Sequence, residues 1–377
     1  MAAPLPRSRP PFRAEHVGSL LRPPEVLAAR ERHTRGKLSA TERAAIEDDA
    51  IRAIVREQER MGFQAVTDGE FRRESWHLDF FQRLANVVAA PSPIHVSFHA
   101  ETGDIQRAPS ALRVVGKLAR PRAIFVEHFQ FLKSVAGAVP KISIPSPSNL
   151  HFRGGRGAVD STAYPDLAEF YADLARVYAA EVADLAVAGC RYLQVDEVNF
   201  AYLCDPRLRE EVQRVGEDPD LLPLTYARLI NKAIEGRPED MTVTLHLCRG
   251  NFEGAWLAAG GYEPVAEVLF NSIEADGYFL EYDTERAGDF QPLRLVPKGK
   301  IVVLGLITTK RGSLERVDDL RRRIDEASRY VPLEQLALSP QCGFASAGRG
   351  NPLTFEEQWA KLRLVVETAR AVWGDPP

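Results

Sequence analysis

Residues 165–197, PDLAEFYADLARVYAAEVADLAVAGCRYLQVDE, combine a helix pattern and a strand pattern in one continuous stretch. In the first part, Phe170, Leu174 and Val177 recur at the spacing of one helix face, and Gly189 follows as a helix stop. The second part, RYLQVDE, is a short apolar run of strand length. A helix that leads directly into such a strand is the unit that builds parallel sheets, so this stretch indicates the α/β class.

The same strand pattern recurs along the whole chain. Amphipathic segments separate the runs, such as the one that begins with a predicted capping box of Ser39 and Glu42 and ends at Gly62. Eight such units, with no glycine-rich dinucleotide turn in the first, favour a single (β/α)8 TIM barrel over a doubly wound sheet. The expected strands are FRAEHVGS (12–19), FQAVTDGE (63–70), PKISIPSP (140–147), RYLQVDE (191–197), MTVTLHLC (241–248), GYFLEYD (277–283), KIVVLGLITT (300–309) and LALSPQC (336–342).

We expect residues 12–377 to form this one catalytic domain. The chain has 377 residues, of which 45% are hydrophobic, and this is ample for a barrel-sized core. Within about residues 85–122, the segments PIHVSFHAETGD and ALRVVGKL alternate apolar and polar residues. This alternation predicts a hairpin-like insertion before the third strand. The Pro- and Arg-rich residues 1–11 are expected to be a disordered N-terminal arm.

Composition and charge exclude several classes of partner. The formal net charge is −4 and the chain shows no basic stripe, so we expect no binding to nucleic acid. No signal-peptide core and no apolar run of roughly eighteen residues is present, which predicts a cytoplasmic protein without membrane contact. The four widely spaced cysteines do not resemble a disulfide framework and are expected to be free thiols or metal ligands. A homo-oligomer is compatible with the sequence.

Polar residues concentrate at the C-terminal ends of the expected strands, which is where a TIM barrel builds its active site. The interiors of the runs are nearly free of ionisable residues, so we predict that this end of the barrel is the active face. The residues at the strand ends are His16, Ser19, Asp68, Glu70, Ser146, Ser148, Asp196, Glu197, His246, Cys248, Glu281, Asp283, Thr308, Thr309, Lys310 and Cys342.

One strand end carries the spacing of metal ligands. His246 and Cys248 are two residues apart, so in a strand their side chains emerge on the same face. The pair alone is weak evidence, because cysteine often only packs in a core. Cys342 at another strand end completes a His, Cys, Cys set, which strongly prefers zinc. Glu281, also at a strand end, is placed to be a fourth ligand that the substrate displaces. We therefore expect one Zn²⁺ per chain.

The charge of this ligand set predicts the kind of chemistry. Two thiolates and a carboxylate make zinc a poor Lewis acid, so activation of water for hydrolysis is disfavoured. A substrate thiol, in contrast, loses its proton on the metal and stays nucleophilic. The sequence therefore predicts a zinc-dependent alkyltransferase that acts on a small thiol.

At these same residues the sequence resembles the catalytic domain of cobalamin-independent methionine synthase and its single-domain relatives, from HVGSLLRP to SPQCGF. The resemblance implies that the four proposed ligands are zinc ligands. It implies that Gly18 and Ser19 hold the carboxylate of homocysteine, and that Glu70 and Asp196 meet its ammonium group. Where that family has a histidine as proton donor after the seventh strand, this sequence has GLITTKRG, with Lys310 nearest that place.

The sequence also resembles a second branch of the superfamily, the epoxyalkane:coenzyme M transferases, which are single barrels. This resemblance implies that zinc-bound coenzyme M opens an epoxide to a 2-hydroxyalkyl thioether. A sulfonate-bearing thiol needs cations near the metal, for which Arg249, Lys310 and Arg311 are available by sequence position. Lys310 or His16 would serve as the catalytic donor to the incipient alkoxide.

The sequence is therefore compatible with two reactions of the metal-bound thiol, and the observations favour them almost equally. Coenzyme M with an epoxide is the leading one, and transfer of a methyl group from a methyl-folate or another donor to homocysteine is the alternative. Ser19, Glu70 and Asp196 favour the alternative, because an ammonium-binding pair has no evident use with coenzyme M. Two minor alternatives are a metal-free barrel that resembles uroporphyrinogen decarboxylase and a non-catalytic thiol- or metal-binding protein.

Overall fold

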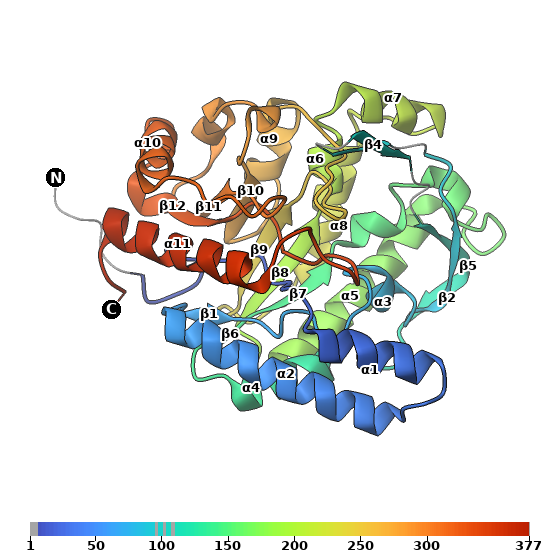
Figure 1. Ribbon diagram of the computed structural model, residues 1–377. Helices are drawn as coiled ribbons and strands as arrows, with labels where there is room; N and C mark the ends of the chain where they lie inside the picture. Colours follow the sequence, from blue (N-terminus) through green and yellow to red (C-terminus); the bar gives the residue numbers. More distant parts are fainter. Residues whose placement is uncertain (1–6, 95–96, 101–102, 107–109, 377) are drawn as a thin grey trace.

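Six parallel strands form most of the barrel wall in the computed structural model, which describes residues 7–94, 97–100, 103–106 and 110–376. Every neighbouring pair in this sheet is parallel. Figure 1 shows the sheet near the centre of the molecule with helices around it. In spatial order the strands are β12 (Leu336–Pro340), β11 (Ile301–Ile307), β10 (Gly277–Glu281), β9 (Thr242–Leu247), β8 (Tyr192–Glu197) and β7 (Ile142–Pro145).

The ring continues past β7 through a short strand pair. Strand β1 (Ala65–Val66) pairs in parallel with β6 (Val139–Pro140), and β6 runs into β7 through the single residue Lys141. The N–H of Lys141 donates to the carbonyl of Val66 at 2.8 Å. The second and third expected strands therefore lie side by side in the wall.

The first expected strand closes the ring without being a regular strand. Only Ala14 forms a parallel bridge, to Leu338 of β12, and Glu15 N–H donates to the Leu338 carbonyl at 2.9 Å. On its other side, Leu20 N–H donates to the Gly69 carbonyl at 3.1 Å. The predicted α/β class and the (β/α)8 TIM barrel are confirmed, with the correction that residues 12–19 contribute a bridge and loop instead of a strand.

Helices follow most strands and cover the outside of the barrel. Figure 1 shows α10 and α11 beside β11 and β12, and α2 and α4 beside β1 and β6. The predicted capping box of Ser39 and Glu42 is present at the start of α2, and Gly62 ends that helix with φ +99°. The helices are α1 (Pro24–Thr34), α2 (Ala40–Met61), α3 (Leu78–Phe81), α4 (Val126–Val135), α5 (Leu167–Val187), α6 (Asn199–Tyr202), α7 (Pro206–Arg214), α8 (Leu222–Ile234), α9 (Glu263–Asn271), α10 (Val317–Ala327) and α11 (Phe355–Trp373). No helix within the described residues is long and apolar enough to cross a bilayer.

An antiparallel excursion interrupts the barrel before the third strand, where the insertion was predicted. Strand β2 (Ala85–Pro91) pairs with β5 (Ser110–Ala119), and β3 (Ser97–Ala100) pairs with β4 (Gly103–Gln106). The β3–β4 hairpin also reaches the loop after β9. The N–H of His99 donates to the Trp256 carbonyl at 2.7 Å, and the reverse bond measures 2.9 Å. The insertion is therefore anchored to the active end of the barrel.

Residues 1–6 of the predicted N-terminal arm lie outside the described residues. Within the rest of that segment, Pro11 is buried, and its carbonyl accepts a hydrogen bond from the Arg7 guanidinium at 2.8 Å.

A buried charge network occupies the barrel interior below the strand ends. The Lys141 ammonium is 3.2 Å from the Glu15 carboxylate and also donates to the His16 carbonyl. The same carboxylate accepts from the Tyr192 hydroxyl at 2.9 Å and from the Phe12 N–H at 2.9 Å. Burial lowers the pKa of Lys141, and Glu15 opposes that shift. Glu15 therefore supplies the charge that makes a lysine tolerable inside the barrel.

Removal of this carboxylate should be strongly destabilising. We expect Glu15→Ala to lower the free energy of unfolding by about 3–5 kcal/mol, because it leaves a buried ammonium without its counter-ion. Urea unfolding measures the change. Asp49→Ala is the control, since the Asp49–Arg52 pair is exposed and is expected to contribute less than about 1 kcal/mol. A loss of stability in Glu15→Ala no larger than in the control would contradict this account.

Candidate metal centre and active site

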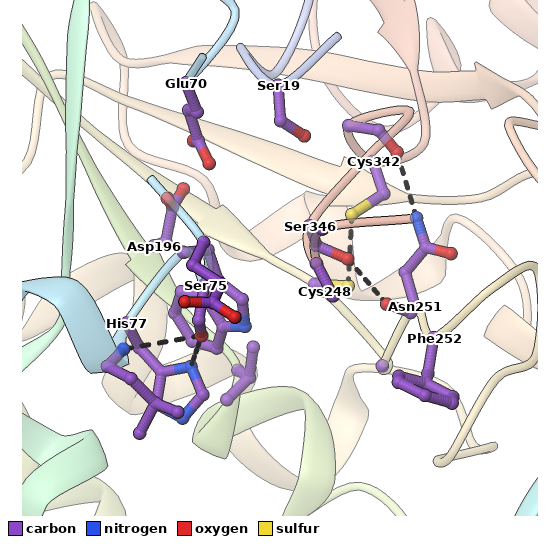
Figure 2. Close-up of a pocket in the computed structure, with 18 of the residues that line it drawn as sticks. Ser19, Glu70, Ser75, His77, Asp196, Cys248, Asn251, Phe252, Cys342 and Ser346 are labelled. Atoms are coloured by element: carbon purple, nitrogen blue, oxygen red, sulfur yellow. Dashed lines mark hydrogen bonds between the residues drawn. The ribbon is translucent and has the colours of Figure 1, made fainter. Parts of the chain in front are cut away.

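Three predicted ligands meet at the C-terminal end of the barrel. His246 lies in β9, Cys248 follows its last residue, and Cys342 follows β12. Their ligand atoms lie within 4.8 Å of one another, and all three side chains are buried. The two sulfurs are 3.3 Å apart, as Figure 2 shows. The structure thus brings together residues from two strand ends that are distant in sequence.

The donor set fits a soft divalent metal. Both ring nitrogens of His246 are buried and have no hydrogen-bond partner, which is costly unless a further group binds there. Hydrogen bonding to Cys342, together with burial, raises the pKa of the Cys248 thiol, and the same contact lowers that of Cys342. One histidine and two cysteines in close contact form a typical zinc-binding set.

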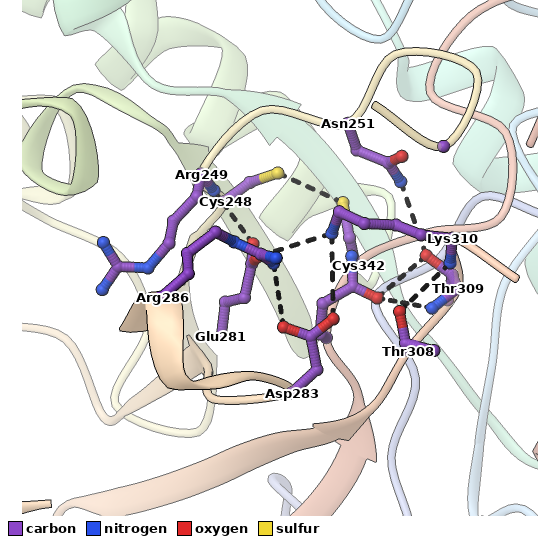
Figure 3. Close-up of polar contacts among 12 residues, drawn as sticks. Cys248, Arg249, Asn251, Glu281, Asp283, Arg286, Thr308, Thr309, Lys310 and Cys342 are labelled. Carbon is purple, nitrogen blue, oxygen red and sulfur yellow. Dashed lines mark hydrogen bonds and ion pairs between the residues drawn. The ribbon is translucent and has the colours of Figure 1, made fainter. Parts of the chain in front are cut away.

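Glu281 lies beside this cluster but outside the group of converging ligand atoms found among the described residues. It is the last residue of β10, and its side chain is fully buried. One carboxylate oxygen accepts from the N–H of Arg249 at 3.0 Å. The other contacts the Arg286 guanidinium and lies 3.4 Å from the Lys310 ammonium (Figure 3). Burial alone would raise the pKa of Glu281, but these cations lower it to about 2, so the carboxylate is ionised.

Lys310 lies at the end of the barrel that carries the candidate metal ligands, as the sequence predicts, but it is already paired. Its ammonium is 3.4 Å from Glu281 and 4.0 Å from Asp283. A lysine held between two carboxylates is poorly placed to bind a sulfonate. Its predicted role as a catalytic acid therefore receives no support from its contacts.

Arg249 and His16 lie away from the site. Figure 3 shows the Arg249 guanidinium directed away from the two cysteines, and it lies 4.3 Å from the centre of the Tyr262 ring. The His16 ring packs edge-on against Phe63 at 5.0 Å, while its neighbour Val17 lines the cavity. Burial and Lys141 hold the pKa of His16 well below its ordinary value. The predictions that Arg249 binds substrate and that His16 donates a proton therefore do not agree with where the side chains point.

A cavity of about 1010 Å³ opens above the cluster. His246, Cys248 and Cys342 line it, together with the predicted substrate-binding residues Ser19, Glu70 and Asp196. Figure 2 shows Ser19, Glu70 and Asp196 on the side of the cavity away from Asn251 and Phe252. The aromatic residues Trp76, Phe98, Tyr202 and Phe252 also line it. The cavity thus joins the cluster of candidate metal ligands, a polar wall and an aromatic wall.

Two buried carboxylates dominate the polar wall. One oxygen of Glu70 accepts from the Ser143 hydroxyl at 2.9 Å, while the other is buried without a partner. Asp196 accepts from the Gln194 amide at 2.7 Å. Burial raises the pKa of Asp196 to about 7; the charge of His246 opposes this shift and the Glu70 carboxylate adds to it. The wall therefore has acceptor capacity for a cationic group.

Glycines allow the loops to approach closely at Ser19. A Cβ on Gly343 would lie 1.9 Å from the Ser19 hydroxyl oxygen, so any larger residue after Cys342 would displace that hydroxyl from its position. Gly18 has φ +143°, a conformation that residues with side chains rarely adopt. The predicted HVGS segment and the SPQCGF segment thus form one continuous part of the cavity floor.

Asn251 and Arg286 are two further polar residues that the sequence patterns do not reveal. The Asn251 amide donates to the Gly343 carbonyl at 2.9 Å, and its own carbonyl oxygen is buried without a partner. Arg286 approaches Glu281 from a loop five residues further along the chain. Asn251 lies in an irregular segment and Arg286 in a single 3-10 turn (Glu285–Ala287), and both are too short for a periodic pattern to predict the direction of a side chain.

Comparisons with known proteins agree with this geometry. Residues 12–371 match the family model described as the catalytic domain of cobalamin-independent synthase. The protein YxjH of Bacillus subtilis is 45% identical over 365 residues, which cover 96% of this chain and 95% of that protein. A methionine synthase of Pyrococcus abyssi is 25% identical over 328 residues, which cover 87% of this chain and 84% of that protein.

Two solved structures are also similar. A Listeria monocytogenes protein described as a candidate vitamin-B12-independent methionine synthase has a TM-score of 0.77 and 38% identity, covering 98% of this chain and 100% of that one. A B12-independent methionine synthase from a Shewanella species, solved with selenomethionine, has a TM-score of 0.69 at 20% identity, covering 96% of this chain and 97% of that one. The second likeness concerns the fold alone.

The raised pKa of Asp196 generates a pH-dependent prediction. In metal-free protein, Asp196→Asn should stabilise the fold by about 2–4 kcal/mol at pH 8 and have little effect near pH 4. The folded-state pKa of about 7 exceeds the ordinary value of 3.8. The wild-type protein therefore loses stability as the pH rises through this window, because a buried carboxyl must ionise. Asparagine keeps an acceptor for Gln194 but carries no charge.

Urea unfolding at several pH values between about 4 and 8 measures this difference. Asp240→Asn is a suitable control, because Asp240 is an exposed partner of Arg191. Its effect should be small and nearly independent of pH. An Asp196→Asn effect that is equal at both ends of the pH range would refute the assigned shift.

Proposed function

Because the chain belongs to the family of cobalamin-independent synthase catalytic domains, we propose that it transfers a methyl group from a small donor to the thiol of homocysteine, which gives methionine. The observation that carries this proposal is one cavity lined by both the His246, Cys248 and Cys342 cluster and the carboxylates of Glu70 and Asp196. A thiol that also bears an ammonium group satisfies both features at once.

In this proposal, zinc is held by His246, Cys248 and Cys342, with Glu281 as an additional ligand from β10. The cluster fits such an ion, since its nitrogen and sulfur donors converge and the histidine nitrogens have no other partner. When bound, zinc supplies an electron-rich Lewis acid that keeps a thiol deprotonated near neutral pH while leaving its sulfur nucleophilic.

The chain's own residues orient the substrate. Glu70 offers an unpaired buried oxygen, and Asp196 ionises fully when an ammonium group arrives beside it. Ser19 and the backbone at Gly18 lie near the other end of this wall and are suited to a carboxylate. Such contacts orient the thiol towards the cysteine cluster. A bound and oriented thiol reacts faster than a free one, because the entropic cost of bringing the reactants together has already been met on binding.

The aromatic residues of the cavity suit the methyl donor. Phe98 comes from the inserted β3 strand and lies 5.5 Å from Phe252, measured between ring centres. Trp76 lines the same cavity from the loop after β1. These rings exclude water from the part of the cavity that would hold the methyl donor. A thiolate that is less hydrated reacts more readily with the methyl group.

The hypothesis of a reaction between coenzyme M and an epoxide agrees less well with these contacts. It requires a cation for the sulfonate near the metal, but Lys310 is paired with two carboxylates and Arg249 points elsewhere. Glu70 and Asp196 would instead repel an anion. Arg153 and Arg349 do line the cavity, so the functional test must also include coenzyme M with an epoxide.

Zinc content tests the metal site. We expect the purified protein to hold one zinc per chain and Cys342→Ser to retain less than about one tenth of it, since loss of a thiolate ligand removes much of the binding free energy. Metal analysis after dialysis measures the content. Cys204→Ser is a matched control, because Cys204 is buried but lies outside the cluster. Full zinc occupancy in Cys342→Ser would show that the ligand set is wrong.

The reaction itself needs a comparison of substrate pairs. Zinc-loaded protein should form methionine from homocysteine and a methyl donor such as a methyl-folate. It should not consume coenzyme M in the presence of epoxypropane. Asp196→Asn should raise the KM for homocysteine at least about tenfold, which is the cost of losing one charge-assisted contact. Epoxide-dependent consumption of coenzyme M without methionine formation would contradict the proposal and indicate an epoxyalkane:coenzyme M transferase instead.

A further inference from the structure

A methyl-folate donor needs a proton that the residues around the cavity are poorly suited to supply. Its methyl group is bound to a neutral nitrogen, which leaves as an anion unless an acid protonates it. The Lys310 ammonium is paired with buried carboxylates. His77 lines the cavity, but burial and the charge of Arg153 hold its pKa well below its ordinary value, so its neutral ring is a weak acid. In the proposed function, Asp196 is committed to the substrate ammonium. A donor that needs no proton therefore agrees better with these residues.

Aromatic rings form a second feature of the cavity. Phe98 and Phe252 lie 5.5 Å apart between ring centres, and Trp76 and Tyr202 line the same cavity. Phe252 and Trp76 are only half-buried, and Phe252 is four residues beyond the candidate ligand Cys248. The face of an aromatic ring is partly negative and attracts cations, including ligands whose positive charge is covered by methyl groups. The wall is therefore suited to a methylated cation close to the cysteine cluster.

Asn251 adds an acceptor beside these rings. Its amide donates to the Gly343 carbonyl at 2.9 Å, which fixes the orientation of the side chain next to Cys342. Its carbonyl oxygen is buried without a hydrogen-bond partner, and the residue lines the cavity next to Phe252 (Figure 2). Methyl groups on a positively charged atom have polarised C–H bonds, which such an oxygen can accept. This acceptor therefore favours a cationic methyl group over a neutral one.

Carboxylates outnumber arginines around the cavity. Among the described residues, Glu74, Asp79 and Glu253 line it together with the two acids of the polar wall. The arginines in the described lining are Arg153 and Arg349, and Arg349 is exposed. Acids around a concave surface raise the local concentration of cations and oppose an anion such as the glutamate tail of a folate. The charge balance thus favours a donor that carries a positive charge.

From these features we propose that the methyl donor is a small onium compound, in which the methyl group is bound to a positively charged sulfur or nitrogen. The aromatic wall and the Asn251 carbonyl contact the cationic methyl groups, and Arg153 is suited to a carboxylate elsewhere on the donor. The identity of the thiol acceptor rests on the proposed function, but binding of the donor does not.

The transfer is balanced without an acid or a redox partner. The thiol has already lost its proton to solvent, and the thiolate sulfur forms a bond to the methyl carbon while the bond from that carbon to the onium atom breaks. The electron pair of the broken bond stays on the onium atom, which becomes a neutral sulfide or tertiary amine. An anion and a cation thus give two neutral products. A cavity wall that excludes water favours a step in which charge disappears.

Matched pairs of ligands test donor binding to the purified protein. Trimethylglycine is compared with tert-butylacetate, in which a neutral carbon replaces the charged nitrogen. Dimethylsulfoniopropionate is compared with methylthiopropionate, which lacks one methyl group and the positive charge. Calorimetric titration should show at least about fivefold tighter binding of the onium compound in one or both pairs, as expected of a cation held against aromatic rings. A preference in one pair alone assigns the donor to that kind of onium.

Substitutions in the aromatic wall test its contribution. Phe252→Leu should reduce the preference for the onium compound at least about threefold, because leucine is apolar but has no ring face. Phe252→Tyr should keep the preference within about twofold, since the ring remains. Phe98→Leu should act in the same direction as Phe252→Leu and gives an independent result if that variant does not fold. Tyr330→Leu is the control, because Tyr330 is exposed and lies outside the cavity lining.

Methionine formation from homocysteine separates this inference from the proposed function. The preferred onium compound should support it in the zinc-loaded protein, and faster than a methyl-folate does. Methionine formation from methyl-folate alone would leave the proposed function standing and overturn the onium donor. Equal binding within both ligand pairs, or a preference that neither leucine variant reduces, would overturn it too. If the onium compound binds as expected but homocysteine is not methylated, the donor site stands and the proposed function fails.

Discussion

The alternation of side chains along β9 is the constraint on which the site depends. Because residues two apart share a face, His246 and Cys248 both project into the cavity, and the neighbouring strands must run parallel to present their ends at the same level. The register of β9 with β8 and β10 places Asp196 opposite His246, and Leu247 opposite Leu280 just before Glu281. A shift of one residue would turn both ligands away from the cavity. The geometry of β9 therefore sets two of the three candidate metal ligands, and the end of β12 supplies the third, Cys342.

Electrostatic pairing divides the polar residues into two groups with different behaviour. Glu281 and Asp283 form ion pairs with Arg286 and Lys310, so their charges are balanced within the protein. Glu70 and Asp196 line the cavity: one oxygen of Glu70 lies 3.6 Å from the Arg73 guanidinium, the other has no hydrogen-bond partner, and burial makes ionisation of Asp196 costly. An arriving cation relieves that cost. Acidic residues are thus paired with cations on one side of the His246, Cys248 and Cys342 cluster and line the open cavity on the other.

The sequence predicted the features that follow from periodicity and strand ends. It identified the barrel, the insertion and the convergence of His246, Cys248 and Cys342, because each depends on regular spacing along strands. It could not predict the directions of His16 and Arg249, since one lies in a loop-like first segment and the other in a turn. It also placed Lys310 near the metal without revealing its partners. Contacts made by loops, such as that of Arg286 with Glu281, depend on tertiary packing, for which a single sequence has no periodic signal.

The insertion has a consequence for how this barrel can diversify. Strands β2 to β5 carry none of the candidate metal ligands and none of the acids of the polar wall, yet β3 contributes Phe98 to the cavity. Substitutions at Phe98 can therefore change the shape of the cavity on the aromatic side without altering His246, Cys248 or Cys342. The fold therefore separates a peripheral antiparallel insertion from the barrel strands that carry the candidate metal ligands, so the two parts of the cavity wall can vary independently in sequence.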